Sequence, residues 1–250
     1  MKRGLLIIDR GSREKEVRGE LSYICQKVRE KGNYHFSNYC FLEVIPPFIE
    51  EGIEKCLSQG IEALTIVPYF LYPGKKIKAA VTTAIKLQSK TNVKFTVSKP
   101  MTLHKSMIDL VDKRIEDVIS KNKISLPKKE IDILIIGHGS KDPNAQTSIK
   151  YVMEGLTSKY RNVNHCFLEI EEPNIEQGIN NCVKNSPKVL IVMLYFLHEG
   201  AHVKRDIFEE LNPAIEKANL KNVLVSKHLG TDEKMIDLIL ERAKEVEIDH

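Results

Sequence analysis

The chain has 250 residues, of which 42% are hydrophobic and 29% are charged, and its formal net charge is +4 at pH 7. These proportions are typical of a soluble globular protein and exclude a disordered chain. The charge is too small, and the lysines are too scattered, for a nucleic-acid-binding protein. No apolar run approaches the roughly 18 residues that a membrane helix needs. The first apolar run is too short for a signal peptide, so we expect a cytoplasmic protein that binds no membrane.

Short apolar runs alternate with helical periodicity along the whole chain. In the first half the pattern predicts strands at 5–8, 39–44, 63–70 and 93–97, and helices at about 14–30, 47–57, 76–87 and 105–119. In the second half it predicts strands at 133–136, 166–170, 189–196 and 222–225, and helices near 145–159, 174–183, 203–218 and 232–246. Strands that alternate with helices predict parallel sheets with right-handed crossovers.

The second half of the chain repeats the first. Segment 40–56, CFLEVIPPFIEEGIEKC, and segment 166–182, CFLEIEEPNIEQGINNC, are identical at ten of their seventeen positions. The chain is therefore two copies of one module. We expect one lobe over residues 1–120, a charged linker over 121–130 and a second lobe over 131–250. The expected fold class is α/β, with two similar lobes, each a parallel sheet flanked by helices, and an active site in the cleft between the lobes.

Two histidines follow predicted strands of the second copy. His138 stands in a Gly-His-Gly-Ser motif after the strand at 133–136, and His202 follows the strand at 189–196. Open α/β sheets bind ligands at the carboxyl ends of their strands. Two neutral imidazoles can bind a divalent transition metal, or one can act as a base while the other is a ligand. A single histidine at such a position is equally well explained as a structural residue.

Glu169 ends a predicted strand of the second copy, and Glu43 is its equivalent in the first. A carboxylate beside two histidines can be a third metal ligand, a proton acceptor or a group that orients a ligand. In a purely structural role, both glutamates would cap the helices that start near Pro47 and Pro173. The sequence leaves the two roles of Glu169 open.

Basic residues gather near the predicted helix starts of both copies. Cations gain nothing from the dipole at a helix N-terminus, so this clustering favours an anionic substrate. The glycine-rich turns match no nucleotide-binding motif. The basic residues are Arg10, Arg13, Lys75, Lys76, Lys78, Lys141, Lys204 and Arg205.

The motifs GHGS at 137–140, FLE at 167–169 and GAHVKRDI at 200–207 resemble those of the CbiX/SirB family of sirohydrochlorin chelatases. The resemblance covers essentially the whole chain. It implies ATP-independent insertion of Co²⁺ or Fe²⁺ into sirohydrochlorin, on the way to cobalamin or sirohaem, with no tightly bound cofactor. It also implies that His138 and His202 form the metal site.

The resemblance further implies how the tetrapyrrole is held and which half of the chain is catalytic. Sirohydrochlorin carries carboxylates, which we expect Arg10, Lys76, Ser140 and Lys204 to bind. Many long family members have the histidine pair in their first half, whereas this chain has Arg10 and Lys76 there. The second lobe is therefore expected to be catalytic, and the first to be a degenerate copy that holds the substrate.

Two other functions fit the same residues less fully. A metal carrier or sensor would use the same two histidines without turnover. A histidine phosphatase would use His138 as the phosphoryl acceptor, but it needs an arginine beside the nucleophile, where this chain has Gly137. The sequence does not choose between cobalt, iron and nickel, or between a monomer and a homodimer.

Overall fold

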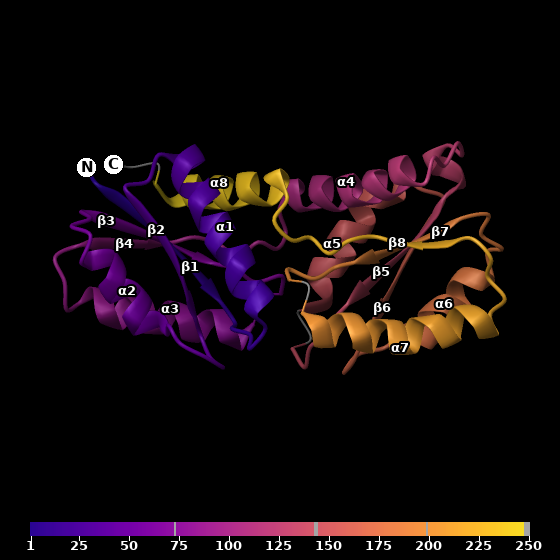
Figure 1. The fold of residues 1–250 in the computed structure, drawn as a ribbon, viewed down its shortest axis with the longest axis horizontal. Helices are drawn as coiled ribbons and strands as arrows, with labels where there is room; N and C mark the ends of the chain where they lie inside the picture. The colour runs from indigo at the N-terminus through magenta and orange to yellow at the C-terminus, as the bar shows by residue number, and fades with distance from the viewer. Residues whose placement is uncertain (73, 143–144, 199, 248–250) are drawn as a thin grey trace. The chain divides into compact units, whose positions relative to one another are not determined.

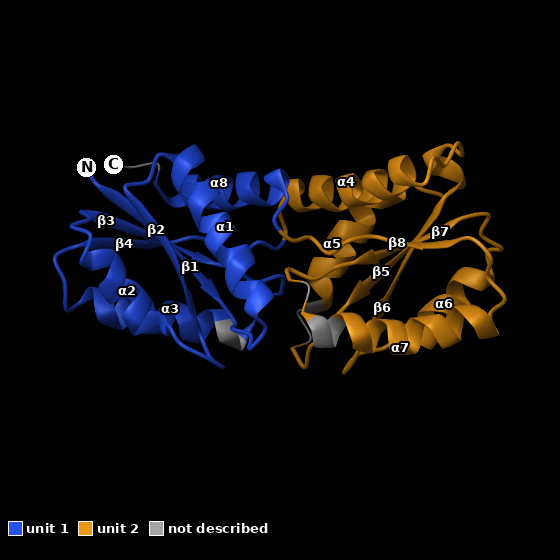
Figure 2. Ribbon diagram, viewed as in Figure 1, with its two compact units in different colours: residues 1–102, 231–250 blue, residues 103–230 orange. Residues whose placement is uncertain are grey.

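The computed structural model of the chain describes residues 1–72, 74–142, 145–198 and 200–247, without the side chains of residues 75, 76, 145 and 201–203. The chain forms two compact units (Figure 2). The first unit consists of residues 1–102 and 231–250, and the second of residues 103–230. No helix in the described part of the chain is both long enough and apolar enough to cross a membrane.

Each unit contains one parallel four-stranded sheet. The first sheet has the order β2-β1-β3-β4, with β1 (Arg3–Asp9), β2 (Phe36–Phe41), β3 (Ala63–Pro68) and β4 (Lys94–Val97). The second has the order β6-β5-β7-β8, with β5 (Asp132–Gly137), β6 (Asn162–Phe167), β7 (Leu190–Leu194) and β8 (Val223–Val225). In each sheet the strand order reverses at the first strand, so the switch point lies between the first and third strands.

Helices cover both faces of each sheet (Figure 1). In the first unit, α2 (Ile49–Leu57) and α3 (Lys75–Gln88) cover one face, and α1 (Lys15–Gly32) and α8 (Glu233–Glu247) cover the other. In the second unit, the corresponding pairs are α6 (Ile175–Val183) with α7 (Ala201–Lys217), and α5 (Ala145–Thr157) with α4 (Lys105–Lys121). Because both faces are covered, the central strands are buried over almost their whole length and are mainly apolar, as the sequence predicted. A short 3₁₀ helix, Lys128–Glu130, precedes β5.

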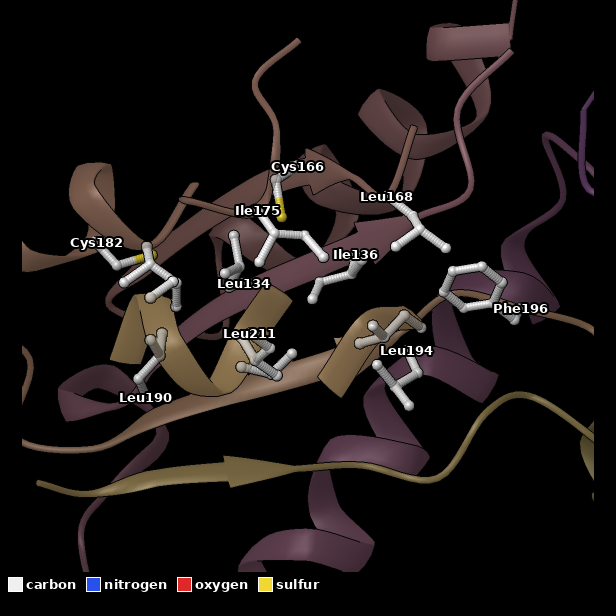
Figure 3. Packing of buried hydrophobic residues seen from close by; sticks show 14 residues of the cluster. Leu134, Ile136, Cys166, Leu168, Ile175, Cys182, Leu190, Leu194, Phe196 and Leu211 are labelled. Atoms are coloured by element: carbon white, nitrogen blue, oxygen red, sulfur yellow. The ribbon is translucent and has the colours of Figure 1, made fainter. Parts of the chain in front are cut away.

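Close contact between one helix and the sheet is built into the repeated segment. Figure 3 shows the apolar cluster between the sheet of the second unit and its helices α6 and α7. A Cβ atom on Gly178 of α6 would lie 2.6 Å from the Cβ of Cys166 on β6. In the first unit, a Cβ atom on Gly52 of α2 would lie 2.5 Å from the Cβ of Cys40 on β2. The glycine and cysteine recur in both copies because only a small residue lets the helix approach the strand this closely.

The last helix of each sequence copy belongs to the other compact unit. Helix α4 ends the first copy, but it packs on α5 and β7 of the second unit, and α8 packs on α1, β3 and β4 of the first. The side chain of Ile108 on α4 fills the space over Gly155 of α5. A Cβ atom on Gly155 would lie 2.5 Å from Ile108 Cδ1. The boundaries predicted at 120 and 131 thus follow the sequence repeat and not the compact units. Helical periodicity shows that a face is buried, but it does not show which sheet buries it.

A carboxylate anchors each of these exchanged helices. Asp112 of α4 accepts hydrogen bonds from Tyr160 Oη at 2.6 Å and from Lys159 Nζ at 2.7 Å. Glu247 of α8 accepts a hydrogen bond from Tyr34 Oη at 2.8 Å. The two tyrosines occupy equivalent positions of the two copies, just after α1 and α5. Because charge-assisted hydrogen bonds are stronger than neutral ones, these contacts fix both helices against their sheets.

An arginine from each exchanged helix binds the backbone at the point where the chain leaves that unit. Arg242 of α8 donates to the carbonyl oxygen of Thr102, the last residue of the first unit before α4. Arg114 of α4 donates at 2.6 Å to the carbonyl oxygen of Leu229, which lies just before the chain returns to the first unit. The two crossing points are therefore stabilised by the same interaction.

Replacement of Asp112 by asparagine should destabilise the protein in a pH-dependent way. Burial raises the pKa of Asp112, but hydrogen bonds from Lys159, Tyr160 and Lys128 outweigh it and hold the pKa below its ordinary value of 3.8. Because the pKa is lower in the folded state, the stabilisation is complete above about pH 4 and is lost as the pH falls through the folded-state pKa. We expect Asp112→Asn to lower the free energy of unfolding by about 1–3 kcal/mol at pH 7.

Urea unfolding at pH 7 and at pH 3 would measure this effect. The difference between Asp112→Asn and the wild type should shrink at pH 3. The control is Asp117→Asn on the exposed side of the same helix, where Asp117 forms ion pairs with Lys113 at 3.4 Å and with Arg114 at 3.6 Å. That change should cost less than about 1 kcal/mol. An equal loss for Asp112→Asn at both pH values would contradict the assignment.

Candidate functional site

His138 directly follows β5, the strand at the switch point of the second sheet. Parallel hydrogen bonding between β5 and β6 continues beyond both strands. Leu168 N donates to Gly137 O at 2.9 Å, and Glu169 N donates to His138 O at 3.1 Å. This register places Glu169 Oε1 3.4 Å from His138 Nε2. The structure thus brings together two of the residues that the sequence singled out.

The paired side chains lie at the surface of the second unit. The His138 side chain is 33% exposed and that of Glu169 is 56% exposed. The Phe196 ring, which follows β7, lies against the imidazole at 6.4 Å between ring centroids. A carboxylate and an aromatic ring thus neighbour the imidazole, and a third of the His138 side chain remains exposed to solvent.

A tight turn follows Glu169 and ends the strand earlier than predicted. Glu171 N donates to Glu169 O at 2.8 Å, which closes a γ-turn around Ile170, whose φ is +73°. Strand β6 ends at Phe167 and not at Ile170, so Glu169 lies in the loop beyond the strand. A β-branched residue at positive φ is a backbone outlier, with a strain of about 1–3 kcal/mol. The loop that carries Glu169 therefore holds a conformation that its sequence does not favour.

Gly139 allows this loop to pack against the residue after His138. Its φ is +92°, and a Cβ atom there would overlap the carbonyl oxygen of Glu169. The next residue, Ser140, donates its backbone N–H to Glu171 Oε2 at 2.9 Å, and its hydroxyl accepts a hydrogen bond from Asp142 N at 3.1 Å. Ser140 thus joins the two loops of the site. The contact of Ser140 with a substrate stays a prediction of the sequence.

The helix-capping role considered for Glu169 and Glu43 is wrong. At the start of α6, Asn174 and Gln177 form a reciprocal capping box, with both hydrogen bonds at 2.9 Å. At the start of α2, the carboxylate of Glu51 accepts a hydrogen bond at 2.7 Å from the backbone. Both helices are capped by other residues, so neither glutamate is needed for this purpose.

The first unit has the same backbone hydrogen bonds and γ-turn, but a different pair of side chains. Glu43 N donates to Arg10 O at 3.1 Å, and Ile45 N closes a γ-turn on Glu43 O at 3.0 Å, with Val44 at φ +78°. Arg10 stands where the second unit has His138, and its Nε donates to Glu43 Oε1 at 3.0 Å. A permanent cation thus lies beside this glutamate. The Arg10 side chain is still 57% exposed, so its guanidinium has room for a further anion.

The other predicted site residues follow the third strand of each sheet. His202 is the second residue of α7, which follows β7, but its side chain lies outside the described residues. Lys76 is the second residue of α3, and its side chain is likewise not described. Lys204 is exposed in the first turn of α7. No group of three or more His, Cys, Asp or Glu side chains that could hold a metal ion occurs among the described residues.

Sequence reasoning missed a carboxylate near this site, that of Glu210. Burial raises the pKa of Glu210 on α7, and the negative charges of Asp206 and Glu169 raise it further. The charge of Glu169 thus acts on Glu210 of α7. The missed signal was the spacing of His202, Asp206 and Glu210, because residues four apart share one face of a helix. The Glu210 carboxylate makes the surroundings of Glu169 more negative, which favours a cation.

Replacement of Gly139 by alanine should disrupt the site. The positive φ and the overlap with the Glu169 carbonyl predict a loss of about 2–4 kcal/mol in the free energy of unfolding. Gly19 is the matched control because it is exposed in α1 and has nothing within 4 Å of a built Cβ atom. Gly19→Ala should stabilise the protein by about 0.5–1 kcal/mol. Denaturant unfolding of both variants measures whether the free energy of unfolding falls in Gly139→Ala and rises in Gly19→Ala. An unchanged free energy of unfolding in Gly139→Ala would refute this account of the loop.

The CbiX family model matches the chain twice, at residues 4–118 and 132–246. These matches follow the two sequence copies and include α4 in the first and α8 in the second. Together they cover far more than half of the chain. The family is thus recognised in both copies, including the copy that has Arg10 in place of a histidine.

Relatives and solved structures resemble the chain over nearly its whole length. A sirohydrochlorin cobaltochelatase of Priestia megaterium is 23% identical over 249 residues, which are 97% of this chain and 79% of that protein. A sirohydrochlorin ferrochelatase of the same organism is 24% identical and covers 96% of this chain and 89% of that protein. A solved structure of SirB from Bacillus subtilis with Fe³⁺ has a TM-score of 0.82 at 23% identity, covering 98% of this chain and 95% of the other. The structural likeness shows a shared fold.

Proposed function

The chain belongs to the CbiX family, and we therefore propose that it is a sirohydrochlorin chelatase, which inserts Co²⁺ or Fe²⁺ into the tetrapyrrole without ATP. Relatives that match the chain over nearly its whole length are named for one or the other of these two activities. The observation that carries the proposal for this site is the distance of 3.4 Å between His138 Nε2 and Glu169 Oε1. An imidazole nitrogen and a carboxylate oxygen together suit a divalent transition metal.

Metal insertion requires groups that give up an ion and accept protons. Each divalent ion that enters the macrocycle replaces two pyrrole N–H protons, so the net charge is conserved. His138 presents the ion through the lone pair of Nε2, and the Glu169 carboxylate binds the ion or accepts a proton that leaves the ring. His202 follows β7, the neighbour of β5 in the sheet, and in this proposal it supplies the second imidazole.

In the first unit, Arg10 stands at the position of His138, and this difference supports the assignment. Arg10 places a guanidinium beside Glu43 in the same backbone framework that holds His138 beside Glu169. The framework therefore accommodates a positive charge beside its glutamate. Because Arg10 is a permanent cation, a metal ion is repelled from this position. The proposed reaction accordingly takes place in the second unit.

The basic residues have a separate part in the proposal. The carboxylates of sirohydrochlorin pair with Arg10, Lys76 and Lys204, and the Ser140 hydroxyl supplies a further polar contact. Arginine binds carboxylates through two parallel hydrogen bonds, so Arg10 can hold one of them while its Nε remains on Glu43. The cytoplasmic location and a monomeric or homodimeric state stay predictions of the sequence.

Loss of the metal-presenting residues should abolish turnover. We expect His138→Ala and His202→Ala to lower kcat/KM at least about 100-fold. Glu169→Gln should lower it about 10–100-fold, because the amide keeps the shape but neither carries the charge nor takes the proton. The matched control is Glu43→Gln, the same change in the first unit, which should keep kcat within about threefold. The measurement is anaerobic conversion of sirohydrochlorin with Co²⁺ or Fe²⁺, followed in the visible spectrum.

The same assay separates the proposed function from its competitors. Many turnovers per protein molecule support a chelatase. Stoichiometric uptake of metal without turnover would identify a carrier or sensor. Release of phosphate from a generic ester would identify a phosphatase, and full activity in His138→Ala would remove this histidine from the site.

A further inference from the structure

Both units expose a strained, branched apolar side chain at the same position. Ile170 is 55% exposed at φ +73°, and Val44 is 45% exposed at φ +78°. Glycine adopts this backbone conformation without strain, whereas β-branched residues are poorly suited to it. A side chain that faces solvent gains little from burial in the folded protein to offset the strain. The strained residue therefore points to a contact outside the folded chain.

Ile170 lies between the two anchors of the site. The residue before it, Glu169, faces His138 at 3.4 Å, and the residue after it, Glu171, accepts a hydrogen bond from Ser140 N at 2.9 Å. The γ-turn hydrogen bond of 2.8 Å from Glu171 N to Glu169 O fixes the backbone between them. Ile170 is thus an apolar residue that directly follows the carboxylate residue of the proposed metal site, in a turn fixed at both ends.

We propose that Ile170 is a substrate-positioning residue that packs on the face of the tetrapyrrole macrocycle. The proposal rests on the chelatase function and names one contact of that site. The macrocycle is flat and apolar on its faces and carries its carboxylates at the rim, so basic residues hold the rim and an apolar group suits the face. A rigid contact orients the ring without the entropic cost of ordering a flexible side chain.

The charged surroundings make an apolar contact necessary at this point. Glu169, Glu171 and Glu172 surround Ile170 in the sequence, and all of them repel the carboxylates of the substrate. A macrocycle whose centre lies over the ion between His138 and Glu169 extends across the adjoining residue. In the part of the chain that the structure describes, the second unit exposes two large apolar side chains, those of Ile170 and Leu103.

The test compares variants of Ile170 in substrate binding, metal binding and stability. Ile170→Gly and Ile170→Asn remove the apolar group, and both new residues tolerate positive φ. We expect each to raise the KM for sirohydrochlorin about tenfold, with kcat within about threefold, because one apolar contact is lost and the reacting groups remain. Affinity for Co²⁺ alone should not change, and the thermal midpoint should equal or exceed that of the wild type. Ile170→Val introduces the residue of the first unit and should behave as the wild type.

Ile85 supplies the matched control, because it is also an exposed isoleucine, at 58%, but lies on α3 of the first unit. Ile85→Asn should leave KM unchanged. A wild-type KM in both Ile170→Gly and Ile170→Asn, or an equal rise in Ile85→Asn, would overturn the assignment of Ile170. Absence of turnover in the wild-type protein would instead refute the chelatase function, so the two failures are distinguishable.

Discussion

Two backbone hydrogen bonds beyond the ends of β5 and β6 hold the proposed site together. They run from Leu168 N to Gly137 O and from Glu169 N to His138 O. The first continues the parallel pairing of the two strands, and the second holds the loop after β6 beside His138. The γ-turn then ends the ladder and turns the chain away. These backbone hydrogen bonds therefore set the distance between His138 and Glu169.

The duplicated framework separates what the backbone does from what the side chains do. Both units share the ladder extension, the γ-turn and the glycine whose Cβ would overlap a glutamate carbonyl. They differ in the residue beside that glutamate, which is Arg10 in one unit and His138 in the other. A guanidinium fills the position permanently, whereas an imidazole leaves it to an exchangeable cation. One substitution thus decides which copy can present a metal ion.

The exchange of α4 and α8 makes the stability of each unit depend on both sequence copies. Each unit obtains one covering helix from the other copy, anchored by Asp112 or Glu247 and fixed at the crossing by Arg114 or Arg242. Neither copy alone contains all the helices that cover its own sheet. The sheet edge that presents His138 and Glu169 consequently depends on residues from both halves of the chain.

The sequence by itself determined the duplication, the α/β class, the existence of β1–β8 and α1–α8, and the placement of His138 after a strand at a ligand-binding edge. These features are encoded locally, in apolar periodicity and in glycine-rich turns. It overestimated the ends of β2 and β6, because nothing in Val44 or Ile170 indicates a positive φ. Only the tertiary structure decided that Glu169 faces His138 rather than capping a helix, and that the closing helices change units. Such contacts join residues far apart in the chain, and periodicity shows that a face is buried without showing what buries it.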